Sequence, residues 1–184
     1  MAFFLSLSPG IPVVVTARST DRLQSLVSHI RDDLKGVVHP VALDVTSPES
    51  ITKFVEEAVR LLKNITILVN NAGIAIEKHA LTYPLKDWDA VFDTNLKGAW
   101  LVAQGVAQHM VKNKIPGKII NITSITGTRV PKALPAYSAS KAGLTHLTKV
   151  LASEWAKYNI RFVHRPVGGP LFCSRSPSSG FKWV

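Results

Sequence analysis

Apolar positions along the chain form two alternating patterns, short continuous runs and longer stretches with helical spacing. The run 13–17 is rich in β-branched residues and is bounded by a proline and by Arg18, which predicts a buried strand. Ser19 or Thr20 then caps a helix that Gly36 ends, and its apolar side follows helical spacing at Leu23, Leu26, Val27, Ile30 and Leu34. A strand followed directly by an amphipathic helix is the repeating unit of α/β proteins.

The same unit recurs along the rest of the chain. Further strands are expected over 37–43, 65–69, 117–123 and 160–163. One further helix is expected to start after the N-cap Ser47, with Pro48 as its first residue. Two more are expected over 87–113 and over 136–158. Strands alternating with helices of this length imply right-handed crossovers. The sequence therefore predicts the α/β class, with a doubly wound, Rossmann-like parallel sheet.

Length and composition indicate one domain. The chain has 184 residues, of which 46% are hydrophobic and 18% charged, a balance that excludes a disordered chain. No apolar run reaches the roughly 18 residues of a membrane span, so no membrane association is expected. The single cysteine, Cys173, makes no internal disulfide, and no Cys/His cluster suggests a metal. These features favour a reducing compartment, the cytoplasm.

The charge is distributed unevenly. The net charge is +10, yet the chain up to Asp93 carries nine basic and eleven acidic residues, whereas the part from Thr94 onward carries thirteen and one. Such asymmetry can mark a nucleic-acid face. The basic residues of the second half are scattered singly, however, without the interleaved aromatic residues or arginine clusters that bind RNA and DNA. We therefore expect no nucleic-acid partner.

Candidate chemistry should be sought directly after the strands, because ligands of parallel sheets bind beyond the carboxyl ends of the strands. This rule selects Arg18, Asp44, the segment 70–73 and Ser124. Most of these places carry small or polar residues, which suit backbone contact with a ligand.

Tyr137 and Lys141 are four residues apart near the start of a predicted helix, so their side chains share one face. A phenol has a pKa near 10, and a cation a few ångströms away favours its ionised form. The pair can therefore act as acid and base. Ser124 follows the preceding strand, where its hydroxyl could hold the same ligand oxygen. Asn95, a poor residue for a helix interior, could bind a water that connects to Lys141. Taken singly, each of these residues has an ordinary structural explanation.

Together, the motifs Asn70-Asn71-Ala72-Gly73, Asn95, Ser124 and Tyr137-Ser138-Ala139-Ser140-Lys141 resemble those of the short-chain dehydrogenase/reductase family. Asp44-Val45 resembles the family's adenine-contacting element. The resemblance runs from about Ile11 to Arg161, and it implies an oxidoreductase that interconverts an alcohol and a carbonyl with NAD or NADP.

The resemblance also implies roles for single residues. Tyr137 would exchange the proton of the substrate, and Lys141 would assist it while binding the nicotinamide ribose. Ser124 would polarise the carbonyl oxygen, and Asn95 would hold a water in the proton relay. The cofactor cleft would be lined by Asn71, Ala72, Gly73, Asp44 and Val45. Members that prefer NAD have an acid at the position that Ala17 occupies in this chain. Arg18 follows it, and because an arginine suits a 2′-phosphate, NADP is preferred over NAD.

Both ends depart from the family pattern. The family opens with a strand, a glycine-rich turn and a helix that cradle the pyrophosphate, and residues 1–10 do not match that unit. We expect either an open gap between the strands at Val13 and Ile65, or an antiparallel substitute in which residues 2–7 fold back through Pro9-Gly10. After Val163 the family's last strand is missing, and the Ser/Pro/Gly-rich stretch 164–184 predicts a flexible tail on a domain over 1–163.

Two functions remain open from the sequence. The first is the oxidoreductase, supported by the proton-transfer residues and opposed by the missing pyrophosphate cradle. The second is an inactive family fragment that associates with related subunits through the helices over 87–113 and 136–158, which in relatives form the subunit interface. A homo-oligomer through these helices is expected in either case.

Overall fold

The computed structural model describes residues 11–32, 37–129, 131–167, 173–176 and 180–183. In these residues, parallel strands form two separate sheets. In the first, β1 (Val13–Ala17) pairs with β2 (Val38–Ala42), and Val13 lies opposite Val38. In the second, β4 (Gly117–Ser124) lies between β3 (Ile67–Asn70) and β5 (Ile160–Val167). The strands β6 (Cys173–Ser176) and β7 (Gly180–Trp183) form an antiparallel hairpin.

Helices connect these strands as the periodicity predicted. They are α1 (Thr20–Asp32), α2 (Pro48–Leu62), α3 (Leu85–Phe92), α4 (Ala99–Lys112) and α5 (Pro135–Trp155), with short 3-10 turns over Ala80–Thr82, Ile125–Gly127 and Ala156–Tyr158. The start of α2 is fixed by the expected cap, because the Ser47 hydroxyl accepts a hydrogen bond from the amide of Ser50 at 3.2 Å. The parallel strands with intervening helices confirm the Rossmann-like α/β class.

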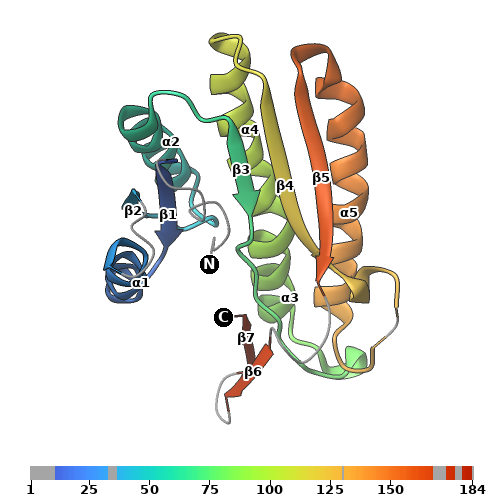
Figure 1. Ribbon diagram of the computed structural model, residues 1–184. Coiled ribbons are helices and arrows are strands. Elements are labelled where there is room, and N and C mark those ends of the chain that lie inside the picture. The colour runs from blue at the N-terminus through green and yellow to red at the C-terminus, as the bar shows by residue number, and fades with distance from the viewer. Residues whose placement is uncertain (1–10, 33–36, 130, 168–172, 177–179, 184) are drawn as a thin grey trace.

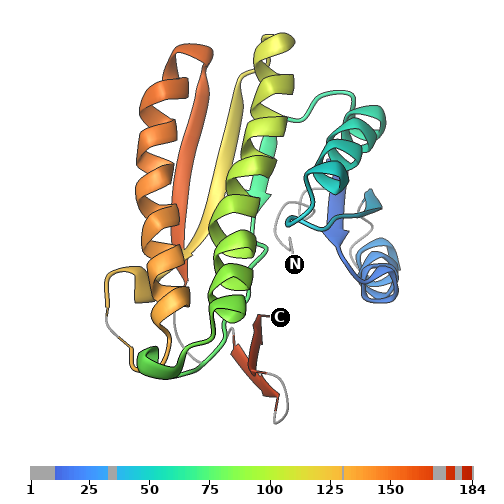
Figure 2. The ribbon, with the colours of Figure 1, turned by 180° about the vertical axis from the view of Figure 1, so that it is seen from behind.

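Hydrophobic side chains pack on both faces of the first sheet and on one face of the second. Val15 and Val38 pack with buried residues of α1, whereas Val14 and Val41 face the larger core shared with α2 and α4. Figures 1 and 2 show α4 and α5 together on one side of the sheet β3–β4–β5, with no described helix on its other side. On the covered side, Ile119 of β4 is fully buried.

The helix predicted over 87–113 differs from the observed one in its middle. A π-helical turn, Asp93–Gly98, separates α3 from α4. Asn95 lies in this turn with its side chain bonded to the backbone of Ile74, and Gly98 lies against Val45, where a Cβ atom would be 2.7 Å from the Val45 carbonyl oxygen. A π turn often marks a functional site, and here it brings the helix close to the ends of two strands.

The last parallel strand is longer than predicted. β5 continues four residues beyond Val163, although Pro166 carries no amide hydrogen. Because the Asn159 carbonyl accepts from Gly117 of β4, the residues at alternate positions after it also face β4, and Pro166 faces the outer edge. No described strand pairs with that edge, so the proline costs no sheet hydrogen bond. The chain after 163, predicted as a flexible tail, thus contributes to the sheet as far as Val167 and also includes β6 and β7.

No described strand lies between β1 and β3, the place where a gap or an antiparallel substitute is expected. The substitute would be formed by residues 2–7, which lie outside the described residues.

Candidate functional site

The residues selected by the strand-end rule all lie at the carboxyl ends of their strands. Arg18 follows β1, Asp44 follows β2 by one residue, 71–73 follow β3 directly, and Ser124 ends β4. Figure 1 shows the arrowheads of β1, β3, β4 and β5 pointing the same way, so these residues occur along one edge of the fold. This is the edge at which parallel α/β proteins bind ligands.

Asn95 is fully buried and links three segments. Its Oδ1 accepts a hydrogen bond from the Ile74 amide at 2.8 Å, and its Nδ2 donates to the Ile74 carbonyl at 2.9 Å and to Ser140 Oγ at 3.1 Å. Ser140 in turn donates to the Tyr137 carbonyl at 2.8 Å. The π-helical turn is thereby tied both to the loop after β3 and to the first turns of α5.

Lys141 is buried beside Tyr137. Its side chain is 4% exposed, and its Nζ lies 5.9 Å from the centre of the Tyr137 ring. The ammonium donates a hydrogen bond to the Ile122 carbonyl of β4 at 2.8 Å. Burial lowers the pKa of Lys141 to about 8, because the charged form loses its hydration. The ammonium form therefore still predominates at neutral pH.

Tyr137 is also buried, at 1% exposure, and belongs to a hydrophobic cluster with Ala75, Val91 and Ala136. Further apolar side chains pack against this cluster, namely Ile74, Ile76 and Tyr83 between β3 and α3, Phe92 of α3, and Leu134 directly before α5. Tyr137 is thus packed among apolar side chains from several elements.

Gly73 lies between Asn95 and Lys141. A Cβ atom added to it would be 3.3 Å from Asn95 Oδ1 and 3.4 Å from Lys141 Nζ. The structure therefore brings the predicted Gly73, Asn95, Tyr137 and Lys141 together around one point.

Ser124 lies close to the same turn of α5. It follows Ile122 by two residues on β4, and the turn after it packs on α5, with a Cβ atom on Gly127 3.1 Å from the amide nitrogen of Ala142. Its hydroxyl accepts hydrogen bonds from the amide and hydroxyl of Thr126, at 3.2 and 3.0 Å. A hydroxyl that accepts both of these bonds keeps its own proton available to donate.

Arg18, Asp44 and Val45 form the other part of the edge. Hydrogen bonds from the amide and hydroxyl of Thr46 lower the pKa of Asp44, and the exposed Arg18 nearby adds a smaller effect. Asp44 is thus a fixed carboxylate at the end of β2. Its amide donates to Ser50 Oγ at 3.0 Å, which holds the turn onto α2.

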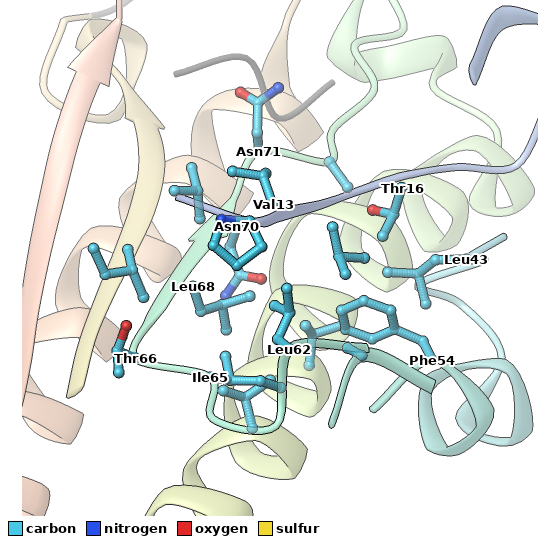
Figure 3. A pocket seen from close by; sticks show the side chains of 18 of the residues that line it. Val13, Thr16, Leu43, Phe54, Leu62, Ile65, Thr66, Leu68, Asn70 and Asn71 are labelled. Carbon is cyan, nitrogen blue, oxygen red and sulfur yellow. The ribbon is translucent and has the colours of Figure 1, made fainter. Parts of the chain in front are cut away.

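A pocket of about 280 Å³ opens between the two sheets. Val45, Asn71 and Ala72, three of the predicted cofactor residues, line it, but Tyr137 and Lys141 do not. Figure 3 shows side chains from β1, β3 and α2 around this pocket. The remainder of its lining is largely apolar.

Sequence reasoning selected Asn70 within the segment 70–73, but it did not find the hydrogen-bond network that Asn70 forms with Asn121 and Thr148. Asn70 donates to the Ala99 carbonyl at 3.0 Å and to Asn121 Oδ1 at 2.9 Å, and Asn121 donates to Thr148 Oγ1 at 2.9 Å. This chain of bonds joins β3, β4, α4 and α5. The only local signal is a polar residue on the apolar face of each element, and the same signal would have singled out Ser140.

The described part of the chain contains no group of three His, Cys, Asp or Glu side chains placed to hold a metal ion. None of its helices combines the length and apolar character needed to cross a bilayer.

The chain is similar to known proteins in both sequence and structure. The sequence is 39% identical over 153 residues to the 3-oxoacyl-(acyl-carrier-protein) reductase FabG of Aquifex aeolicus, covering 83% of this chain and 61% of that protein. It is 38% identical over 117 residues to the 2-dehydro-3-deoxy-D-gluconate 5-dehydrogenase of Escherichia coli, covering 64% of this chain and 46% of that protein. The chain thus spans less than two thirds of the length of these relatives.

Solved structures agree. A short-chain type dehydrogenase/reductase from Mycobacterium marinum matches with a TM-score of 0.80 at 35% identity, covering 83% of this chain and 62% of that one. A gluconate 5-dehydrogenase from Burkholderia cenocepacia, in complex with NADP and tartrate, matches with a TM-score of 0.75 at 31% identity, covering 82% and 59%. The short chain dehydrogenase family matches residues 5–168. The chain therefore belongs to the short-chain dehydrogenase family.

Proposed function

We propose that the protein is an NAD(P)-dependent oxidoreductase that interconverts an alcohol and a carbonyl, with Tyr137 as the general acid and base. The observation that carries this proposal is the packing of Lys141 beside the Tyr137 ring, with Gly73 between the Lys141 ammonium and the Asn95 side chain. A buried cation next to a phenol stabilises the phenolate, which is the form that accepts a proton. The membership of the family, many of whose members are named reductases or dehydrogenases, supports the same reaction class.

In this proposal, each residue of the group has a separate task. The Tyr137 hydroxyl gives its proton to a carbonyl oxygen in reduction and takes it back in oxidation. The Ser124 hydroxyl donates a hydrogen bond to the same oxygen. Lys141 stabilises the phenolate and contacts the nicotinamide ribose. Because both Nδ2 hydrogens of Asn95 are used within the protein, its relay water would be held by its main-chain carbonyl.

The residues present fit a nicotinamide cofactor at two places. Gly73 leaves the space at Asn95 and Lys141 that a side chain would fill, and the pocket reaches Val45, Asn71 and Ala72 at the ends of β2 and β3. When bound, the cofactor supplies the hydride. Asp44 and Val45 would meet the adenine, and the exposed Arg18 would pair with a 2′-phosphate, which favours NADP.

One observation favours a second candidate function, an inactive subunit that associates with related chains. Tyr137 and Lys141 are both buried, and neither lines the pocket between the sheets. The observation that favours association is that α4 and α5 leave large apolar residues partly exposed, with Trp100 at 37% and Val150 at 39%. Such positions suit contact between subunits.

Titration of the chain with NADPH and with NADH, followed by calorimetry, tests the proposal. We expect binding of NADPH, weakened at least severalfold by the substitution Arg18→Ala, while NADH affinity changes little. A folded chain that binds neither nucleotide would remove the oxidoreductase and leave the associating subunit, whose mass in solution would exceed that of one chain.

A further inference from the structure

Two hydroxyl groups meet at the carboxyl end of β4. Ser124, the last residue of this strand, is 5% exposed, and its Oγ accepts a hydrogen bond from the Thr126 hydroxyl at 3.0 Å. The Thr126 amide donates to the same oxygen at 3.2 Å. A hydroxyl oxygen has two lone pairs and carries one hydrogen. Because the two bonds from Thr126 use both lone pairs, Ser124 can offer a ligand only its hydrogen.

The Thr126 hydroxyl therefore decides how Ser124 can act toward a ligand. Without it, one lone pair of Ser124 Oγ would be free, and Ser124 could accept a hydrogen bond from a ligand as well as donate one. A carbonyl oxygen, on which negative charge develops during reduction, needs a donor that already points toward it. The bond from Thr126 also polarises the Ser124 hydroxyl, which makes Ser124 a stronger donor.

The turn that carries Thr126 is held by its own backbone. The Ile125 carbonyl accepts hydrogen bonds from the amide of Thr128 at 3.0 Å, from the amide of Arg129 at 2.8 Å and from the Thr128 hydroxyl at 3.0 Å. These bonds close the 3-10 turn Ile125–Gly127 directly after Ser124. Thr126 lies in the middle of this turn, so its hydroxyl is kept close to Ser124.

The same turn is packed against α5 at Lys141. A Cβ atom added to Gly127 would lie 3.1 Å from the Ala142 amide nitrogen and 3.3 Å from the Lys141 carbonyl carbon, so the turn lies directly on the helix backbone. Lys141 in turn donates to the Ile122 carbonyl of β4 at 2.8 Å. Both the strand end and the turn are thus attached to α5 at Lys141, and Thr126 keeps a fixed place relative to this lysine.

We propose that Thr126 is a positioning residue for the reaction, whose hydroxyl holds Ser124 as a hydrogen-bond donor to the substrate oxygen that Tyr137 protonates. This inference rests on the proposed function, and it adds a residue that acts through Ser124. Thr128 provides a contrast on the same turn, because its hydroxyl donates to the Ile125 carbonyl and not to Ser124.

Steady-state turnover of Thr126→Val and Thr126→Ser tests the proposal, on a substrate that the natural chain accepts from a panel of alcohols and carbonyls. Valine keeps the shape of threonine without the hydroxyl, so kcat should fall about three- to tenfold, as expected for one neutral hydrogen bond, while NADPH affinity stays unchanged. Serine keeps the hydroxyl and should restore most of kcat. The matched control Thr128→Val removes the neighbouring hydroxyl and should leave kcat unchanged. If Thr126→Val lowers the urea midpoint of unfolding, Thr126→Ala removes the same hydroxyl and should give the same fall in kcat.

A Ser124→Ala background separates positioning from a general effect on the turn. In this background Thr126→Val should change kcat by less than about twofold, because the residue through which Thr126 acts is gone. An equal fall in both backgrounds, or an unchanged or raised kcat of Thr126→Val in the natural background, would overturn the role of Thr126 and leave the proposed function standing. A natural chain that binds no nucleotide, or that turns over no member of the panel, would overturn the proposed function and the role of Thr126 with it.

Discussion

Replacing Lys141 with methionine should change how the stability of the protein depends on pH. The buried ammonium donates a hydrogen bond to the Ile122 carbonyl, and burial lowers the pKa of Lys141 from 10.5 to about 8. One pKa unit corresponds to about 1.4 kcal/mol, so the charged side chain costs the folded state roughly 3 kcal/mol relative to the neutral one.

The sign of the effect follows from proton binding. Between about pH 8 and pH 10.5, Lys141 has released its proton in the folded chain, whereas the unfolded chain still binds it. Stability therefore rises with pH in this window. The methionine variant lacks this titration, so its stability relative to the natural chain should fall by roughly 3 kcal/mol from pH 7.5 to pH 10.5.

Urea unfolding followed by tryptophan fluorescence, at pH 7.5, 8.5, 9.5 and 10.5, measures the difference. Comparing the two proteins at each pH cancels the contributions of all other titrating groups. Lys149→Met, an exposed position on the same helix, is the matched control, and its difference from the natural chain should stay constant. Constant differences for both variants would show that the Lys141 ammonium is hydrated in the folded protein, and would refute the burial of this charge.

The remaining predictions concern packing. Gly98→Ala should lower the free energy of unfolding by about 2 kcal/mol, because the new Cβ meets the Val45 carbonyl oxygen. Gly143→Ala, whose Cβ meets only a flexible side chain, should be neutral or stabilising. Urea unfolding that ranks the two variants in the opposite order would contradict the close contact at the π turn. Asn121→Leu should lower the free energy of unfolding by about 2–3 kcal/mol, because it leaves buried polar partners unpaired, and Thr148→Val should lower it by about 1 kcal/mol. The double variant should lose less than the sum of these two values. Strict additivity in a double-mutant cycle would argue against a connected network.

Much of the fold could be predicted from local pattern. The apolar stripes of α1 and α2 and the β-branched runs of β1 and β4 determine these elements with little help from the rest of the chain. The end of β5 could not be predicted, because most of its residues after Ile160 are exposed or half-buried. Their polar sequence resembles that of a tail. Pro166 is also unusual inside a strand, and only the pairing with β4 shows why it is tolerated.

The site was predictable in its members but not in its contacts. The order and spacing of Asn95, Tyr137 and Lys141 identified a family, and the strand-end rule placed the other candidates on one edge. The bonds of Asn95 to Ile74 and Ser140 connect residues 21 and 45 positions apart, which local spacing does not encode. The burial of Tyr137 likewise depends on apolar side chains from elements far apart in the sequence, such as Ala75 and Val91.

Calorimetric titration of NADPH into the natural chain and into Tyr137→Phe, together with turnover of a panel of alcohols and carbonyls, tests the central claim most directly. The phenylalanine variant keeps the ring and its packing but loses the hydroxyl. We expect both proteins to bind NADPH with similar affinity, while the variant turns over roughly 10²- to 10⁴-fold more slowly on any substrate that the natural chain accepts. Equal turnover by both proteins, or a folded natural chain that binds no nucleotide, would contradict the role assigned to Tyr137.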